Sequence, residues 1–336
     1  MSGSKTIRII LQLFTLMVLH SCSAESTFEM LPVELTMAPV SLQTKGNDPD
    51  ENLINDLNLF IFNEEGQLED SKYLSSREIG RNGGRVSVTV SLARGRKTRI
   101  ACCANYGFKI EGIGSFKELS AFRFSLAYPD EYSRGMPMSG NMFGIWTTND
   151  KEITVPLERM MSKISVSLDR SALDDDVRIS VKSMTICNSP RSTSVFGHSS
   201  AAGSSDVFRR GLSKSYAAAD DLNIEASPGV SREVCLYLLE NMRGDLLDDT
   251  TDDSGKVLPS AISQSCSYME LEMEYLSDTW QTKPDEYLKY RFYLGESNFN
   301  FDVERNCHYH YSIQPYGSGL TEDNWRIDKS ALTRRQ

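Results

Sequence analysis

The chain has 336 residues, of which 36 are Lys or Arg and 46 are Asp or Glu, giving a formal net charge of −10. This length accommodates two domains of ordinary size or one large β domain. Because an acidic surface repels phosphate backbones, the composition argues against a nucleic acid partner.

Residues 1–21 have the pattern of a secretory signal peptide. Lys5 and Arg8 provide the positive segment, and residues 9–19 form an apolar run. This run has the length of a signal-peptide core and is too short to cross a bilayer, which needs about 20 apolar residues. We therefore expect residues 1–21 to be removed on export, which lowers the formal net charge to −12 because both basic residues are lost.

The residues around the expected cleavage site resemble a bacterial lipobox. Leu19 lies at −3, Ser21 at −1 and Cys22 at +1, while His20 at −2 departs from the usual small residue. We predict that Cys22 is acylated and becomes the first residue of the mature protein. Several acyl chains hold a protein firmly to a membrane, since each buried CH₂ contributes about 0.8 kcal/mol. The expected location is the outer membrane and the cell surface.

The first half of the mature chain reads as β-strands separated by turns. Strict alternation of polar and apolar residues over 85–92 predicts a half-buried strand. We expect this strand to form a hairpin with residues 97–105. Pro32 and Pro39 place an extended segment at residues 31–42 at a sheet edge. The remaining expected elements are a polar loop at 44–52, a buried strand at 57–62, a short helix at 116–122 capped by Ser115, a turn at 136–140 and a strand at 151–157.

The second half continues in the same style after a boundary near residue 158. Between its strands, residues 188–229 form a stretch rich in Ser, Ala and Gly, which we interpret as a long surface loop. The expected strands are 159–168, 177–187, 233–239, 267–275, 289–294 and 309–314. Many strands with almost no helix predict an all-β sandwich or barrel architecture.

Five short segments, taken in order, resemble the fimbrillins of Bacteroidetes, which are the lipoprotein precursors of type V pili. They are NLFIFNEEG at 58–66, PMSG at 137–140, YLLENMRG at 237–244, YLG at 293–295 followed by FDVERN at 301–306, and NWRID at 324–328. The resemblance implies two tandem transthyretin-like β-sandwich domains, which we place at residues 22–158 and 159–336. It also implies a fimbrial structural subunit that supports adhesion.

In polymerising members of that family, a trypsin-like protease cuts after a basic residue and removes the first strand. The neighbouring subunit then fills the groove by β-strand addition, which satisfies unpaired backbone groups and covers apolar surface. Residues 31–42 have a suitable position, and Lys45 is the only basic residue between Cys22 and Lys72. An Arg-specific protease would not cut there, because the first mature arginine is Arg77. This departure leaves the alternative that the chain stays lipid-anchored at the base of the pilus or forms a cap. The expected partners are other fimbrial subunits, bound by β-strand addition, and the outer membrane, through the lipid anchor.

No set of residues predicts catalysis or a bound cofactor. His308 and His310 share one strand face but lack a third metal ligand nearby, and His198 has no nucleophile motif beside it. The acidic run at 245–253 does not follow a calcium-loop spacing. The cysteines after Cys22 are interpreted as mostly buried small apolar residues. We expect a protein that is not an enzyme and binds no metal.

A second class of function rests on aromatic residues. Together they could form a stacking platform of a surface glycan-binding lipoprotein, although aromatic residues are also enriched in strand packing. The residues are Trp280, Tyr287, Tyr290, Phe292, Tyr293 and Trp325. We favour packing, and with it the fimbrial subunit.

Overall fold

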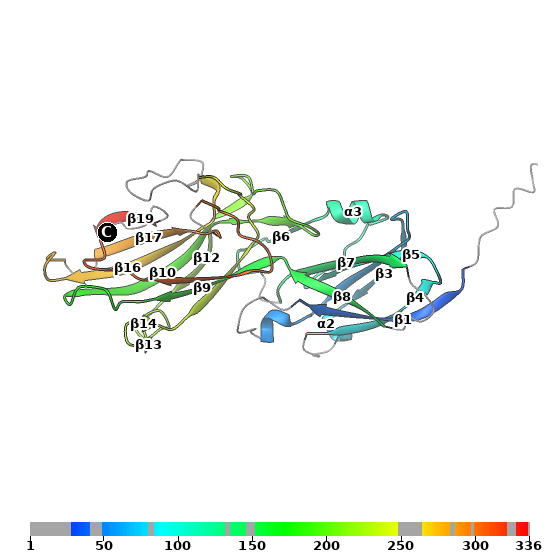
Figure 1. Ribbon diagram of the computed structural model, residues 1–336, viewed down its shortest axis with the longest axis horizontal. Helices are drawn as coiled ribbons and strands as arrows, with labels where there is room; N and C mark the ends of the chain where they lie inside the picture. Colours follow the sequence, from blue (N-terminus) through cyan, green and yellow to red (C-terminus); the bar gives the residue numbers. More distant parts are fainter. Residues whose placement is uncertain are drawn as a thin grey trace, which may run out of the picture.

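A computed structural model describes residues 28–40, 49–79, 84–131, 135–145, 152–247, 264–282, 286–296, 299–320 and 327–334. Two β-rich lobes lie end to end along the long axis of the molecule (Figure 1). The N-terminal lobe is built from β1 to β8, and the C-terminal lobe from β9 to β19. Each lobe has its own large cluster of buried apolar side chains. The predicted all-β fold with two β-sandwiches is confirmed.

The N-terminal lobe contains eight strands and three short helical segments within the described residues. They are β1 (Met30–Pro39), η1 (Pro49–Asn52), β2 (Leu57–Phe62), β3 (Leu68–Leu74), α2 (Ser76–Ile79), β4 (Val86–Ala93), β5 (Lys97–Ala104), α3 (Phe116–Ala121), β6 (Arg123–Ser125), β7 (Met138–Ile145) and β8 (Glu152–Arg159). Helix α3 begins with the predicted cap at Ser115, whose hydroxyl accepts from the N–H of Glu118 while the Glu118 carboxylate accepts from the Ser115 N–H.

Seven of the eight strands of this lobe follow the order β3-β2-β5-β7-β8-β1-β4, whereas β6 pairs with β11 (Ser192–Ser194). The connection between β7 and β8 is narrow, because only Met138 and Ser139 of β7 pair with β8. The result is two layers, β3-β2-β5-β7 and β8-β1-β4, joined at one edge. All six residues of β2 are buried, whereas β4 alternates between buried and exposed positions as its sequence predicts.

The prediction that the first strand lies at a sheet edge was wrong. Strand β1 is interior, antiparallel to β4 and parallel to β8. Its prolines are tolerated because each pairs on one side only: Pro32 pairs with β4 before the β8 ladder begins, and Pro39 pairs with β8 after the β4 ladder ends. A missing N–H is costly only where a ladder needs it.

Two further local predictions for this lobe were also wrong. Strand β4 pairs with β1, and β5 pairs with β2 and β7, so these strands belong to opposite layers and do not form a hairpin. Alternation shows that each strand has one buried face but not which strand lies beside it. Residues 136–140, expected as a turn, instead lead into β7.

The C-terminal lobe is a sandwich of a five-stranded sheet, β12-β10-β16-β17-β19, and a three-stranded sheet, β15-β9-β18. Its elements are β9 (Met161–Leu168), β10 (Val177–Pro190), β11 (Ser192–Ser194), β12 (Val207–Ser215), β13 (Glu225–Ser227), β14 (Val230–Ser231), β15 (Val234–Leu239), β16 (Tyr268–Ser277), β17 (Glu286–Tyr293), β18 (His308–Ile313) and β19 (Ile327–Arg334). Among the described strands, β9 pairs with β15 and β18 and not with β8, so it begins a separate sheet, as expected.

Residues 188–229 do not form the long loop that their composition suggested. They contain the end of β10 and the strands β11, β12 and β13. Residues 192–199, which we call the strap, cross to the N-terminal lobe, where β11 pairs with β6. Val195 is fully buried in the N-terminal core, and the rings of Phe196 and Phe116 stack with centroids 5.6 Å apart. The strap therefore joins the two lobes.

Within the described part of the chain, no helix has the length and apolar character needed to span a bilayer.

Candidate functional site

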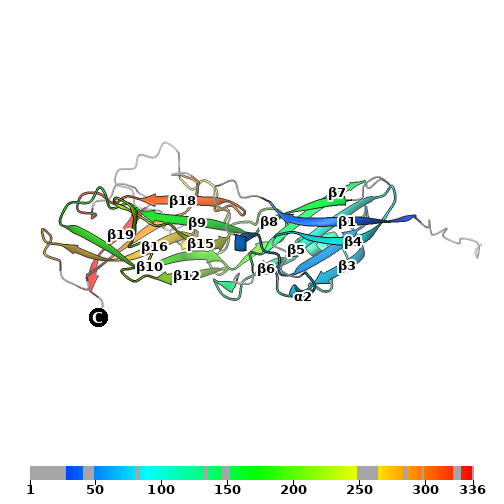
Figure 2. The ribbon, with the colours of Figure 1, turned by 90° about the horizontal axis from the view of Figure 1, so that it is seen from below.

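The position of β1 defines a slot between β4 and β8. Met30 to Met37 pair with β4, and Glu34 to Pro39 pair with β8. Val33, Leu35 and Met37 point into the core with exposed fractions of 2%, 0% and 0%. Figure 2 shows β1 running along the long axis beside β8 and β4. An extended segment with alternating apolar side chains fills this slot, and its backbone hydrogen-bonds on both sides.

Arg159 closes the slot at the end nearest the C-terminal lobe. Its guanidinium donates from Nη1 to the carbonyl oxygen of Val40 at 2.9 Å and to Oδ1 of Asn306 at 3.0 Å. Nε donates to the carbonyl oxygen of Glu51 at 3.1 Å, and Nη2 donates to Oδ1 of Asn52. One buried side chain thus contacts the residue after β1, the helix η1 and the C-terminal lobe.

A second polar contact holds η1 against the C-terminal lobe. The carboxylate of Glu51 accepts from Nζ of Lys163 in β9 at 2.7 Å and from the hydroxyl of Tyr237 in β15. Burial lowers the pKa of Arg159, and the negative charge of Glu51 partly offsets this effect. Since an arginine stays protonated, a positive charge is held in the junction between the lobes and is balanced by carbonyl oxygens and Glu51.

A buried ion pair of the C-terminal lobe holds the strap. Arg305 and Glu240 are 5% and 1% exposed, and their side chains are in direct contact. Glu240 also accepts from the hydroxyl of Thr193 at 2.9 Å and from the N–H of Ser199 at 2.8 Å. Burial alone would raise the pKa of Glu240, but the hydrogen bonds and the charge of Arg305 outweigh it, so the pKa is lowered.

Several residues singled out in the sequence lie outside the described residues. They are Cys22, Lys45, Trp325 and residues 248–253 of the acidic run. Lipidation at Cys22 and processing at Lys45 therefore stay predictions. Asp245, at the start of the acidic run, has its carboxylate bound to Nδ2 of Asn300 at 2.8 Å.

The histidines take part in polar contacts. The hydroxyl of Ser165 contacts Nε2 of His308 and Nδ1 of His310, and burial lowers the pKa of His308. His198 contacts Glu240 and Glu304 at the edge of the strap. Among the described residues, no group of three or more His, Cys, Asp or Glu side chains is arranged to hold a metal ion.

Most of the described cysteines are buried, as the sequence interpretation expected. Cys102, Cys103, Cys187 and Cys266 are buried, whereas Cys235 and Cys307 are partly exposed. Cys102 and Cys103 are both buried because β5 is covered on both faces.

Three of the five described aromatic side chains proposed as a stacking platform are part of the core. Tyr290, Phe292 and Tyr293 are 2%, 9% and 3% exposed, whereas Trp280 is 57% exposed. A ring inside the core cannot stack on a sugar, because both of its faces are covered by protein. The three buried rings therefore support the packing interpretation.

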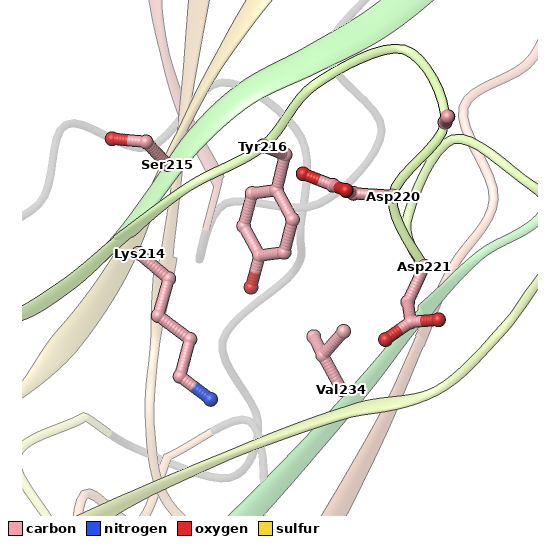
Figure 3. Close-up of a pocket in the computed structure, with 7 residues that line it drawn as sticks. Lys214, Ser215, Tyr216, Asp220, Asp221 and Val234 are labelled. Carbon is pink, nitrogen blue, oxygen red and sulfur yellow. The ribbon is translucent and has the colours of Figure 1, made fainter.

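One polar pocket with a volume of about 370 Å³ lies beside the end of β12 (Figure 3). Lys214, Tyr216, Asp220, Asp221 and Val234 line it. Nζ of Lys214 donates to the carbonyl oxygen of Cys235, whereas the buried hydroxyl of Tyr216 has no hydrogen-bond partner among the described atoms. Burial and the two carboxylates raise the pKa of Tyr216 to about 12, so the phenol stays neutral. With a single aromatic ring, this pocket forms no stacking platform.

The sequence could not show the junction. Arg159 is separated from its partners by 107 to 147 positions in the sequence. Glu51 is likewise distant from Lys163 and Tyr237, by 112 and 186 positions. No local periodicity connects such residues. The only usable signal was an arginine followed by an apolar strand at the predicted domain boundary.

Solved structures of fimbrial proteins share this fold. The tip fimbrial protein Mfa3 of Porphyromonas gingivalis, with a C-terminal truncation, is 14% identical, with a TM-score of 0.53 over 91% of this chain and 100% of that chain. A fimbrilin, FimA, from the same organism is 14% identical, with a TM-score of 0.53 over 88% of this chain and 95% of that chain. At this identity the likeness concerns the fold alone.

The sequence also matches two family descriptions. Residues 236–313 match a domain of unknown function, DUF4906. No curated protein sequence matches the chain. Residues 27–208, more than half of the chain, match the family described as fimbrillin-A associated anchor proteins Mfa1 and Mfa2. The chain belongs to this family of fimbrillin-A associated anchor proteins.

Proposed function

We propose that the protein is a structural subunit of a cell-surface fimbrium, exported as an outer-membrane lipoprotein and joined to its neighbour by β-strand addition. Its role is to build or hold the fimbrium and so support adhesion, and its partners are other fimbrial subunits. The mature chain divides into two domains near residue 158. Family membership supports the fimbrial role, and the two lobes agree with this division.

The observation that carries the proposal is the slot of β1. A single strand at the start of the mature chain supplies three buried side chains to the core, namely Val33, Leu35 and Met37. Removing it exposes two ladder edges and an apolar groove, because β4 and β8 both lose their partner. Such a groove binds an extended segment of another chain strongly, since one strand covers the apolar surface and satisfies both edges.

The N-terminal region provides the means of export and processing. Cys22 in its lipobox-like setting supplies the acylation site, and Lys45 lies between the end of β1 and helix η1. A cut at Lys45 separates the lipid-bearing segment and β1 from the rest of the chain. An uncut chain keeps both, which suits a subunit at the base of the fimbrium.

The test is intact-mass and N-terminal analysis of the protein from host membranes and from sheared fimbriae. We expect acylated Cys22 at the start of the membrane form and Gly46 at the start of the sheared form. Lys45→Gln should abolish the shorter form, whereas Lys72→Gln, a matched change at the next basic residue, should leave it unchanged. Cys22→Ser should abolish acylation.

Two other results would change the proposal. A chain that begins at acylated Cys22 in both fractions would overturn removal of the first strand and assign the protein to the base of the fimbrium. Full-length lipoprotein that never associates with filaments would overturn the fimbrial role and favour the glycan-binding alternative.

A further inference from the structure

The buried side chains alone do not fix how a strand is aligned in the slot. The buried apolar positions of β1 are Val33, Leu35 and Met37, spaced by two, and Thr36 is buried on the opposite face of the strand. A slip of one residue would place polar side chains in the core, so it is strongly disfavoured. A slip of two residues places Leu31, Val33 and Leu35 in these positions, which are again all apolar, so it is penalised much less. The side chains alone therefore do not define where the strand ends in the slot.

Arg159 provides a fixed point at this end of the slot. It is 3% exposed, and its Nη1 divides its hydrogen bonds between the carbonyl oxygen of Val40 and the side chain of Asn306. Asn306 is itself held in a left-handed conformation with φ of 55°, and its N–H donates to the carbonyl oxygen of Met161. The guanidinium thus has partners on both sides that limit its movement.

Of the hydrogen bonds that the guanidinium of Arg159 donates, the one to the carbonyl of Val40 reaches the segment in the slot, because Val40 directly follows β1. Val40 also donates its N–H to the carbonyl oxygen of Leu157 at 2.8 Å, which aligns its peptide with β8. If a strand ended one residue earlier, the carbonyl facing Arg159 would be missing. A longer strand that slipped by two residues would present the carbonyl of another residue at the same place, so the contact depends on how far the strand extends. A buried charged donor without its acceptor is costly, because water cannot replace the lost partner.

We infer that Arg159 is a positioning residue that requires the strand in the β1 slot to extend through the position of Val40, because its guanidinium needs a backbone carbonyl there. This inference rests on the proposed strand addition. The occupant it selects is an extended segment with three alternating apolar side chains and a carbonyl oxygen three residues after the last of them. A small hydroxyl-bearing residue at the position of Thr36 completes the fit, since Thr36 Oγ1 lies 3.0 Å from Ser87 Oγ.

The test uses the full chain cut after Lys45 and three labelled peptides that compete for the slot. The first contains residues 30–39 with a C-terminal amide. The nitrogen of this amide can take the place of the Val40 N–H, but the peptide lacks the Val40 carbonyl. The second contains residues 30–40 with an amide. The third replaces Val40 with Gly, which restores the carbonyl without the side chain. Dissociation rates are followed by fluorescence anisotropy.

In the wild-type protein, the second and third peptides should dissociate about 10- to 100-fold more slowly than the first, the range for a hydrogen bond from a charged donor. In Arg159→Met this ratio should fall to about one, as a double-mutant cycle requires for a direct contact. Arg94→Met is the matched control, because Arg94 contacts Glu29, which lies outside all three peptides. Its ratio should equal that of the wild type.

The outcomes separate the two claims. If no peptide enters the slot of the wild-type protein, the proposed strand addition is wrong. If the peptides bind but the ratio is unchanged in Arg159→Met, strand addition stands and the role of Arg159 is overturned. Should Arg159→Met fail to fold, Asn306→Ala provides the same test, since it leaves the guanidinium free to turn from Val40 and should reduce the ratio.

Discussion

The ion pair of Glu240 and Arg305 offers the most direct check on how the strap is held. The substitution Glu240→Gln removes one charge and leaves Arg305, which is 5% exposed, without a counterion. It also weakens the acceptor for the hydroxyl of Thr193 and the N–H of Ser199. Removing one partner of a buried pair costs about 3–5 kcal/mol, because the remaining charge stays desolvated.

The pH dependence of stability follows from the lowered pKa of Glu240. The folded state favours the ionised carboxylate more than the unfolded state does, so this group stabilises the protein fully above the unfolded pKa of about 4.5. That stabilisation is lost as the pH falls through the lower folded pKa. In Glu240→Gln this part of the acid sensitivity should disappear.

The assay is urea unfolding monitored by far-UV circular dichroism and tryptophan fluorescence, combined with hydrogen exchange of the strap. The two probes show whether unfolding occurs in one transition or two. For a protein with two lobes this must be known before a free energy of unfolding is derived. The matched control is Glu304→Gln, a partly exposed carboxylate that contacts His198 at 3.5 Å, and it should cost less than about 0.5 kcal/mol. Adding Arg305→Met to Glu240→Gln should cost less than the sum of the single changes. A loss below about 1 kcal/mol in Glu240→Gln, or an equal loss in Glu304→Gln, would refute the reasoning.

Three further outcomes test the N-terminal lobe and the thiols. Leu35→Ala should lower the free energy of unfolding by about 2–5 kcal/mol, measured by urea unfolding, whereas the exposed neighbour Glu34→Ala should change it little; equal losses would contradict the interior position of β1. Gly140→Ala should destabilise the lobe or prevent folding, because the added Cβ would overlap a backbone carbonyl of β8; an unchanged melting temperature would contradict the close approach of β7 and β8. Burial raises the pKa of Cys103 to about 12, so in timed alkylation with mass spectrometry it should react far more slowly than the partly exposed Cys235, and equal rates in the native protein would contradict this burial.

Local patterns in the sequence predicted strands well where one face is buried. The alternation at 85–92 and the apolar run at 57–62 correspond to β4 and β2, and the cap at Ser115 begins α3. These features depend only on neighbouring residues, so one sequence is enough to find them.

Features that depend on distant partners could not be predicted in this way. The strap contains small polar residues without periodicity, and its strand β11 is stabilised by β6 of the other lobe. The interior position of β1 also depends on distant partners. Its two prolines wrongly predicted an edge strand, because each lies at a position that is paired on one side only. In the candidate site, the role of Arg159 depends on Val40, Glu51 and Asn306, which only the folded structure brings next to it.

The orientation of β1 also has a mechanical consequence. The strand runs along the long axis of the molecule and is bonded over most of its length to β4 on one side and β8 on the other (Figure 2). A pull along this axis on the chain at Phe28 acts parallel to both ladders, so their hydrogen bonds share the force in shear. A pull across the sheet would instead break the bonds one after another from the end. The lobe is therefore built to resist stretching along its own length far better than peeling from its side.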